Sequence, residues 1–147
     1  IAAGMGVPGL DQHTVGATVA RAVREFQRHV GMHVELTLNG ADVDASQPVK
    51  LTLYRVLQSA LSNCRLHAPD SHVKVLVHCK GDTQVSMTIC DDGPGFSSSQ
   101  VLPGDHWGVS FMQERVRLLG GRFQLRTAPG QGACVEVVLP LQEGEFT

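Results

Sequence analysis

The sequence lacks several features that would assign it to a common class of protein. Its four cysteines contain no C-x-x-C spacing and its seven histidines show no metal-ligand spacing, which argues against a zinc centre. No apolar run approaches the length of a bilayer-spanning helix, and no signal peptide is visible. The formal charge of −2 comes with no basic stripe, which disfavours direct nucleic-acid binding.

The cysteines share one property, since each falls within an apolar helical or strand-like stretch. This placement favours buried free thiols over zinc ligands or disulfides. Free thiols fit a reducing, cytoplasmic setting. The chain begins at Ile1 rather than Met, so we expect it to be a piece of a larger protein. The cysteines are Cys64, Cys79, Cys90 and Cys134.

The sequence has enough apolar material for one domain, because 42% of its 147 residues are hydrophobic. We expect a single domain over residues 1–147, with an ordered core over about 9–141. Apolar spacing predicts helices over 10–30, 46–67 and 108–119, and strands over 34–38, 73–79, 85–91, 122–127 and 134–139. This interleaving predicts an α+β fold, a two-layer α/β sandwich with a mixed, mostly antiparallel sheet covered on one face by helices.

The most informative segment is Asp-Asp-Gly-Pro-Gly-Phe at residues 91–96. It follows a strand-like run in which Val85, Met87 and Ile89 alternate with smaller or polar residues. Side chains two apart in a strand share a face, so Asp91 should point its carboxylate toward the buried side. A buried carboxylate is costly unless a donor meets it, which favours a pocket floor that receives an N–H group of a ligand.

The same six residues also fit an ordinary loop that opens with Asp-Gly and Pro-Gly. On these residues alone the two interpretations carry equal weight. Residues 93–107 continue as a long loop containing Gly, Ser and Pro, without an apolar pattern. Loops of that length inside compact domains are often functional lids.

A second group of polar residues lies on the helix predicted over 46–67. Ser59, Asn63 and His67 are four apart and therefore share one helical face. The amide of Asn63 could bind a hydrated cation or a phosphate, although a solvated helix residue is the commoner role. His67 also fits a cation at the helix end or a buried core histidine.

A third group of segments could bind anions such as phosphates. A helix starting after Gly108 would present free backbone N–H groups to the preceding loop. No Lys or Arg occurs between Lys80 and Arg115, so phosphates held here would depend on backbone dipoles and a divalent cation. The segment 130–132, Gly-Gln-Gly, fits a hairpin turn as well as a ligand contact.

Together these segments resemble the ATP-binding catalytic domain of bacterial sensor histidine kinases, in the superfamily shared with gyrase B and MutL. Within it the chain most resembles kinases that pair with DNA-binding response regulators of the nitrate-sensor type. The resemblance covers about Gly9 to Leu141. The segments that carry it are Tyr54-Arg55-Val56-Leu57-Gln58, Ala60-Leu61-Ser62-Asn63, His67-Ala68, residues 91–96, Met112-Gln113-Glu114-Arg115 and Leu118-Leu119-Gly120-Gly121.

The resemblance implies a Bergerat-type ATP-binding fold, with ATP and Mg2+ as cofactors. Asp91 would accept the adenine amino group, and Asn63 would help hold Mg2+ against the phosphates. Ser59 and Asn63 occupy the catalytic positions. The positions implied to contact the nucleotide are Asn63, His67, Asp91, Gly93, Gly95, Phe96, Gly108, Val109, Gly130, Gly132 and Ala133.

The family also implies partners. The full kinase would phosphorylate a histidine on separate dimerisation helices of the same kinase, and the phosphoryl group would then pass to an aspartate of a response regulator. Contact with a membrane would come only through other parts of the protein.

The chain departs from the family pattern on the phosphate side. Ser59 stands where the subfamily usually has Glu, and losing a positioned base costs about 10²- to 10⁴-fold in rate. Leu66 replaces a usual Lys or Arg, residues 106–109 keep one glycine of two, and Ala133 replaces Thr. A degenerate domain acting through protein contacts is therefore the main alternative. A third, an anti-sigma-factor-like serine kinase, is disfavoured by residues 112–121.

Overall fold

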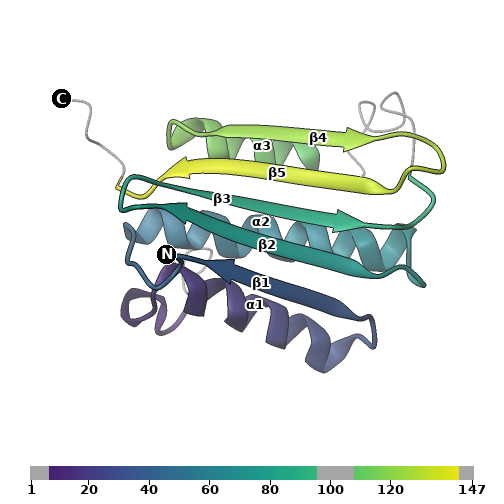
Figure 1. The fold of residues 1–147 in the computed structure, drawn as a ribbon, viewed down its shortest axis with the longest axis horizontal. Helices are drawn as coiled ribbons and strands as arrows, with labels where there is room; N and C mark the ends of the chain where they lie inside the picture. Colours follow the sequence, from purple (N-terminus) through teal and green to yellow (C-terminus); the bar gives the residue numbers. More distant parts are fainter. Residues whose placement is uncertain (1–6, 96–107, 143–147) are drawn as a thin grey trace.

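In the computed structural model, residues 7–95 and 108–142 are described, and they build a five-stranded sheet with helices packed on one face (Figure 1). The elements are, in chain order, η2 (Leu10–Gln12), α1 (Val15–His29), β1 (Val34–Asn39), α2 (Gln47–His67), β2 (Val73–Lys80), β3 (Gln84–Asp91), α3 (Val109–Leu118), β4 (Arg122–Thr127) and β5 (Ala133–Pro140). The strand order across the sheet is β1-β2-β3-β5-β4.

The sheet is mixed, as the sequence predicts. Strands β1 and β2 are parallel, and the other neighbouring pairs are antiparallel. A parallel pair needs a long crossover, and α2 provides it between β1 and β2. The predicted α+β sandwich with helices on one face is therefore confirmed.

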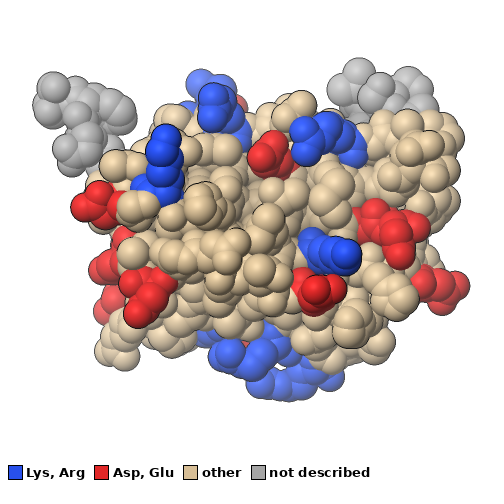
Figure 2. Space-filling model, in the orientation of Figure 1, with Lys and Arg blue, Asp and Glu red and all other residues tan. Residues whose placement is uncertain are grey.

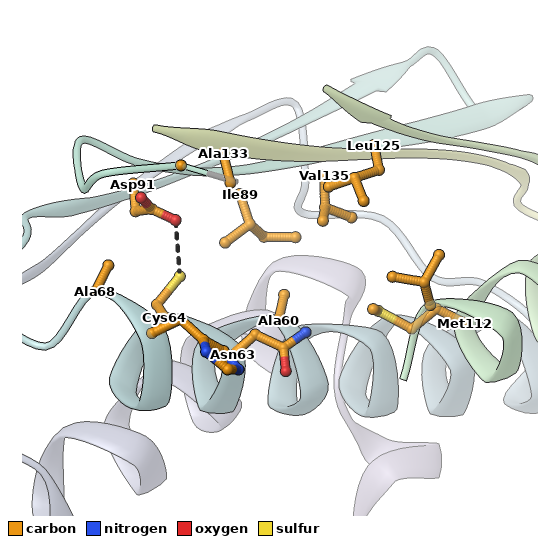
Figure 3. A pocket seen from close by; sticks show the side chains of 13 residues that line it. Ala60, Asn63, Cys64, Ala68, Ile89, Asp91, Met112, Leu125, Ala133 and Val135 are labelled. Atoms are coloured by element: carbon orange, nitrogen blue, oxygen red, sulfur yellow. Dashed lines mark hydrogen bonds between the residues drawn. The ribbon is translucent and has the colours of Figure 1, made fainter. Parts of the chain in front are cut away.

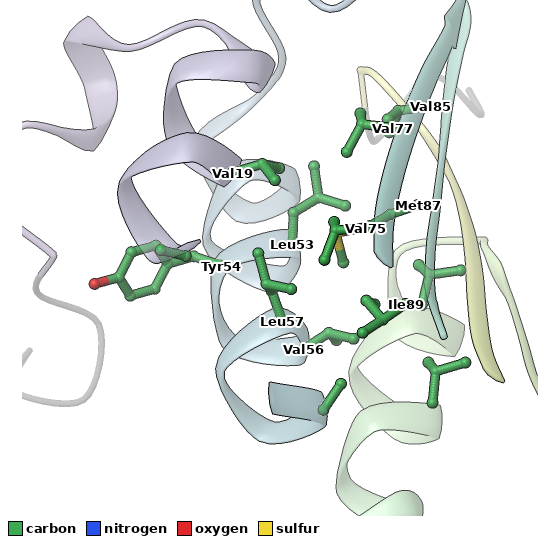
Figure 4. Close-up of a cluster of buried hydrophobic side chains, with 14 of the residues drawn as sticks. Val19, Leu53, Tyr54, Val56, Leu57, Val75, Val77, Val85, Met87 and Ile89 are labelled. Atoms are coloured by element: carbon green, nitrogen blue, oxygen red, sulfur yellow. The ribbon is translucent and has the colours of Figure 1, made fainter. Parts of the chain in front are cut away.

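The core lies between the helices and the inner face of the sheet (Figure 4). Buried and exposed residues alternate strictly along β2, from Val73 to Lys80. On β3 the same alternation buries Val85, Met87 and Ile89. Leu53 and Leu57 of α2 meet these strands and are fully buried, because helical spacing brings them onto one face.

The first predicted helix begins later than residue 10. Residues 10–12 form a short 3-10 turn, and His13 is extended, with φ −106° and ψ 144°. Thr14 then caps α1, since its hydroxyl oxygen accepts the N–H of Ala17 at 3.1 Å. Within the described residues, no helix combines the length and apolarity needed to traverse a bilayer.

Helix α2 begins with a buried cation that sequence patterning did not indicate. Lys50 is 1% exposed, and its Nζ donates to Asp44 Oδ1 at 2.8 Å and to the backbone oxygen of His13 at 2.9 Å. The hydrogen bond from Lys50 lowers the pKa of Asp44 below its ordinary value. This contact ties the start of α2 to the segment that precedes α1.

The expectation of four free thiols is wrong for one pair. Cys90 of β3 and Cys134 of β5 are direct partners in the ladder, with Cα atoms 4.1 Å apart, and they form a disulfide. Both side chains lie on the sheet face that the helices leave open, because buried Ile89 and Val135 beside them point inward. Cys64 and Cys79 are buried and free, as predicted.

Candidate functional site

A narrow pocket lies between α2, α3 and the sheet (Figure 3). Its volume is about 520 Å³ when the space open to solvent is included. Polar groups occupy one end, and the rest is apolar. The lining residues include Ala60, Asn63, Cys64, His67, Asp91, Gly95 and Ala133, together with Ile89, Val109, Met112, Leu125 and Val135.

The carboxylate of Asp91 points into this pocket from the end of β3 (Figure 3). Its Oδ1 accepts the backbone N–H of Gly93 at 2.8 Å. Its Oδ2 faces α2 and accepts the thiol of Cys64 at 3.5 Å. The inward orientation expected from strand alternation is therefore what the structure shows, and the half-buried carboxylate has one donor in the turn after β3 and one on α2.

Cys64 is the partner of Asp91 that the sequence did not reveal. Burial raises the pKa of its thiol to about 12, and the neighbouring Asp91 charge and hydrogen bond act in the same direction. The thiol is therefore protonated at neutral pH and acts as a hydrogen-bond donor. The sequence pattern predicts that Cys64 is buried on α2. Its proximity to Asp91 depends on how α2 packs against β3, which the pattern does not indicate.

The turn after Asp91 packs tightly against the loop between β4 and β5. Gly95 and Gly132 both have left-handed backbones, with φ +67° and +71°. A Cβ at Gly95 would collide with the carbonyl oxygen of Ala128, and one at Gly132 with the carbonyl oxygen of Asp91. Glycine at these two positions is thus required by the chain's own packing, apart from any ligand.

A second hollow, more polar and much wider, adjoins the first. Its volume is about 1240 Å³ when the space open to solvent is included. Helix α1 contributes Arg28 and His29, α2 contributes Ser59 and Asn63, and Gly108 marks the start of α3. We call it the α1–α2 groove. Asn63 lines both hollows, so it stands at the boundary between an apolar pocket and a polar groove.

Most of the predicted site residues meet at these two hollows. The pocket brings together Asn63, His67, Asp91, Val109 and Ala133, which come from four different elements. Ser59 and Gly108 line the groove instead.

Three predicted glycines line neither hollow, and Gly132 is one of them. Gly93 contributes its N–H to Asp91 but does not line the pocket. Gly130 lines neither hollow, and its N–H donates to the carbonyl oxygen of Pro94. Phe96 lies outside the described residues. Met112 and Leu125 form apolar walls of the pocket and were not predicted as site residues. Their apolar spacing in the sequence indicated only that they would be buried.

The amide oxygen of Asn63 suits a magnesium ion that takes most of its ligands from phosphates and water rather than from the protein. Among the described residues, no three His, Cys, Asp or Glu side chains cluster closely enough to hold a metal. Asn63 offers one amide oxygen at the groove. Mg2+ commonly takes one or two protein oxygens, with phosphates and water completing its octahedral shell. Asn63 therefore fits a magnesium–phosphate complex rather than an all-protein metal centre.

Comparison with known proteins agrees with this geometry. Residues 49–143 match the family of histidine kinase-, DNA gyrase B- and HSP90-like ATPases. The chain is 32% identical over 136 residues to the signal transduction histidine-protein kinase/phosphatase DegS of Brevibacillus brevis, covering 92% of this chain and 35% of DegS. It is 31% identical over 117 residues to the sensor histidine kinase LiaS of Bacillus subtilis, covering 80% of this chain and 31% of LiaS. The chain thus spans about a third of these relatives.

Solved structures show the same fold. The histidine kinase domain from the Erythrobacter litoralis EL346 blue-light activated histidine kinase superposes with a TM-score of 0.74 at 20% identity, over 87% of this chain and 61% of that one. The mycobacterial sensor histidine kinase MprB superposes with a TM-score of 0.64 at 19% identity, over 86% and 94%. The resemblance inferred from the motifs is confirmed, and the chain belongs to the family of histidine kinase-, DNA gyrase B- and HSP90-like ATPases.

Proposed function

We propose that this chain is the ATP-binding catalytic domain of a two-component sensor histidine kinase. The observation that supports it most directly is the Asp91 carboxylate inside an apolar pocket that shares the lining residue Asn63 with a polar groove. A purine base is flat and apolar with hydrogen-bonding edges, and a triphosphate is strongly polar. The two adjoining hollows match these two halves of ATP.

Each half of the site has a definite role in this proposal. Asp91 accepts a hydrogen bond from the adenine amino group, while Ile89, Met112 and Val135 enclose the ring. Asn63 holds Mg2+ against the phosphates. Bound Mg2+ would neutralise charge on the transferred phosphoryl group.

The phosphoryl acceptor in this proposal is a histidine on separate dimerisation helices of the same protein, with a response regulator downstream and a cytoplasmic location. Ser59 lines the groove, and it offers a hydroxyl where the family usually has a carboxylate. We therefore expect slower phosphoryl transfer than in kinases with Glu at that position. A degenerate domain that binds ATP without transferring it is the second candidate, and the same serine favours it.

Calorimetric titration with ATP and Mg2+ tests the adenine role. We expect Asp91→Asn to weaken ATP binding by about tenfold or more, because it removes the charge from a hydrogen-bonded carboxylate. Asp92→Asn is the matched control, since Asp92 is exposed and its Oδ1 accepts the N–H of His72 outside the pocket. Equal affinities for all three proteins would refute the role of Asp91. ATP binding without phosphoryl transfer to the dimerisation helices would favour the second candidate.

A further inference from the structure

The α1–α2 groove contains two basic side chains that no sequence motif indicated. Arg28 and His29 occupy the last turn of α1, and both are exposed. They line the same hollow as Ser59, Asn63 and Gly108. Basic side chains also gather over α1 along the lower edge of the molecule in Figure 2. Among the described residues that line the groove, the permanent positive charge comes from Arg28 of α1.

The acidic residue of the groove is already engaged. Glu25 accepts hydrogen bonds from the Tyr54 hydroxyl and from Arg21, whose Nε lies 3.1 Å from Oε2. The Tyr54 hydrogen bond lowers the pKa of Glu25, and the charges of Arg21 and Arg28 contribute to the same shift. Arg28 nevertheless makes no ion pair within 4.0 Å among the residues that the structure describes. The guanidinium of Arg28 is thus able to bind an anion that enters the groove.

The position usually occupied by a cation in this family cannot serve here. Leu66 replaces it, and its aliphatic side chain is 60% exposed. The sequence also has no Lys or Arg between Lys80 and Arg115. Among the described residues that line the groove, the basic side chains are Arg28 and His29, and both come from α1.

We propose that Arg28, assisted by His29, contacts the phosphate groups of the bound nucleotide and provides the side-chain charge that Leu66 does not. This inference rests on the proposed ATP-binding function and extends it. A guanidinium is well suited to the task, because its planar N–H groups match phosphate oxygens. The charge at the end of α1 thereby makes the site selective for nucleotides with several phosphates over the nucleoside.

Titration of ATP with Mg2+, and separately of adenosine, tests the inference. For Arg28→Ala we expect a roughly three- to tenfold loss of ATP affinity with unchanged adenosine affinity. The double variant Arg28→Ala/His29→Ala should lose more. Arg24→Ala is the matched control, because Arg24 is exposed one turn earlier on α1 and does not line the groove. It should bind both ligands as the unchanged chain does.

The outcomes separate the inference from the function on which it rests. If the unchanged chain binds ATP and Arg28→Ala binds it equally well, the phosphate role is wrong and the ATP-binding function stands. Equal losses for Arg28→Ala and Arg24→Ala would overturn it too, since they indicate a general charge effect. Failure of the unchanged chain to bind either ligand would overturn both. Circular dichroism of each variant confirms that the fold is retained.

Discussion

At the scale of single residues, the contact between Cys64 and Asp91 joins the helix that borders the site to the strand that ends in it. The sulfur–oxygen distance is 3.5 Å, and Asp91 has a second donor in the N–H of Gly93. A thiol is a weak donor, so Asp91 keeps most of its capacity to accept a stronger hydrogen bond. The pocket therefore holds its carboxylate in place without saturating it.

Replacing Cys64 by Ala should change how stability depends on alkaline pH. Burial raises the pKa of this thiol from 9.0 to about 12, so the folded state keeps a proton that the unfolded state loses. The stabilisation is complete below about pH 9 and is lost as the pH rises toward 12. Between pH 8 and pH 10, the wild-type chain should lose on the order of 1 kcal/mol more than Cys64→Ala. Urea denaturation at both pH values measures this difference, and an identical loss in both proteins would contradict it.

The inward direction of Asp91 could be predicted from its neighbours, whereas its partner could not. Alternation along Val85, Met87 and Ile89 fixes the face on which Asp91 lies, because a strand has a two-residue period. The proximity of Cys64 depends on how deeply α2 packs against β3. Arg28 and His29 were likewise not predicted as site residues, because their position beside Ser59 and Asn63 depends on how α1 packs against α2.

At the scale of secondary-structure elements, α2 is held at its start by more than its cap. Ser46 accepts the N–H of Val49 at 3.4 Å, and Pro48 lies in the first turn. The buried ammonium of Lys50 then bonds to the backbone of His13 and to Asp44. Because α2 carries Ser59 and Asn63, this anchor also positions the site.

Lys50→Met tests the anchor, since Met fills similar space without a charge. We expect a loss of about 1–3 kcal/mol in the free energy of unfolding at pH 7, because the oxygens of His13 and Asp44 lose a charged donor. Lys50 lowers the pKa of Asp44. The contribution of the Lys50–Asp44 contact to the free energy of unfolding is therefore present above the ordinary carboxyl pKa and is lost on acidification. The variant should therefore lose less stability between pH 7 and pH 3. Thermal unfolding measures both effects, with exposed Lys74→Met as the control.

The elements themselves were largely predictable from apolar spacing. Within residues 7–95 and 108–142, the five strands and the three helices longer than one turn occur where the spacing indicates. The exception is the start of the first helix, where Thr14 competes with the helix as a cap and breaks the pattern begun at Leu10. A lysine at the buried position 50 could not be expected from spacing, because its partners come from outside α2.

At the scale of the whole molecule, the sheet joins strands that are distant in the sequence. Strands β3 and β5 pair although α3 and β4 lie between them, and their register brings Cys90 opposite Cys134. The strand patterns established that both cysteines belong to strands, but the pairing partner and register required the structure. This is why free thiols were expected where a disulfide occurs.

Reduction of this disulfide should destabilise the chain. The bond links residues separated by 44 positions, and closing a loop of that size restricts the unfolded chain by about 4 kcal/mol in the entropic estimate. We expect urea midpoints to fall with dithiothreitol, and the Cys90→Ser/Cys134→Ser variant to unfold at the lower midpoint regardless of reductant. Thiol titration of the unreduced, denatured chain should find two reactive groups. Four would show that the bond does not form.

The position of the disulfide offers a site for a label that reports on movements of β3 when a ligand binds. Cys90 and Asp91 are adjacent in β3, so their side chains project from opposite sides of the strand. A fluorescent or spin label attached to Cys90 in a Cys134→Ser protein would therefore sit behind the wall of the pocket rather than within it. Such a reporter could follow movements of β3 during ligand entry while leaving the cavity unobstructed.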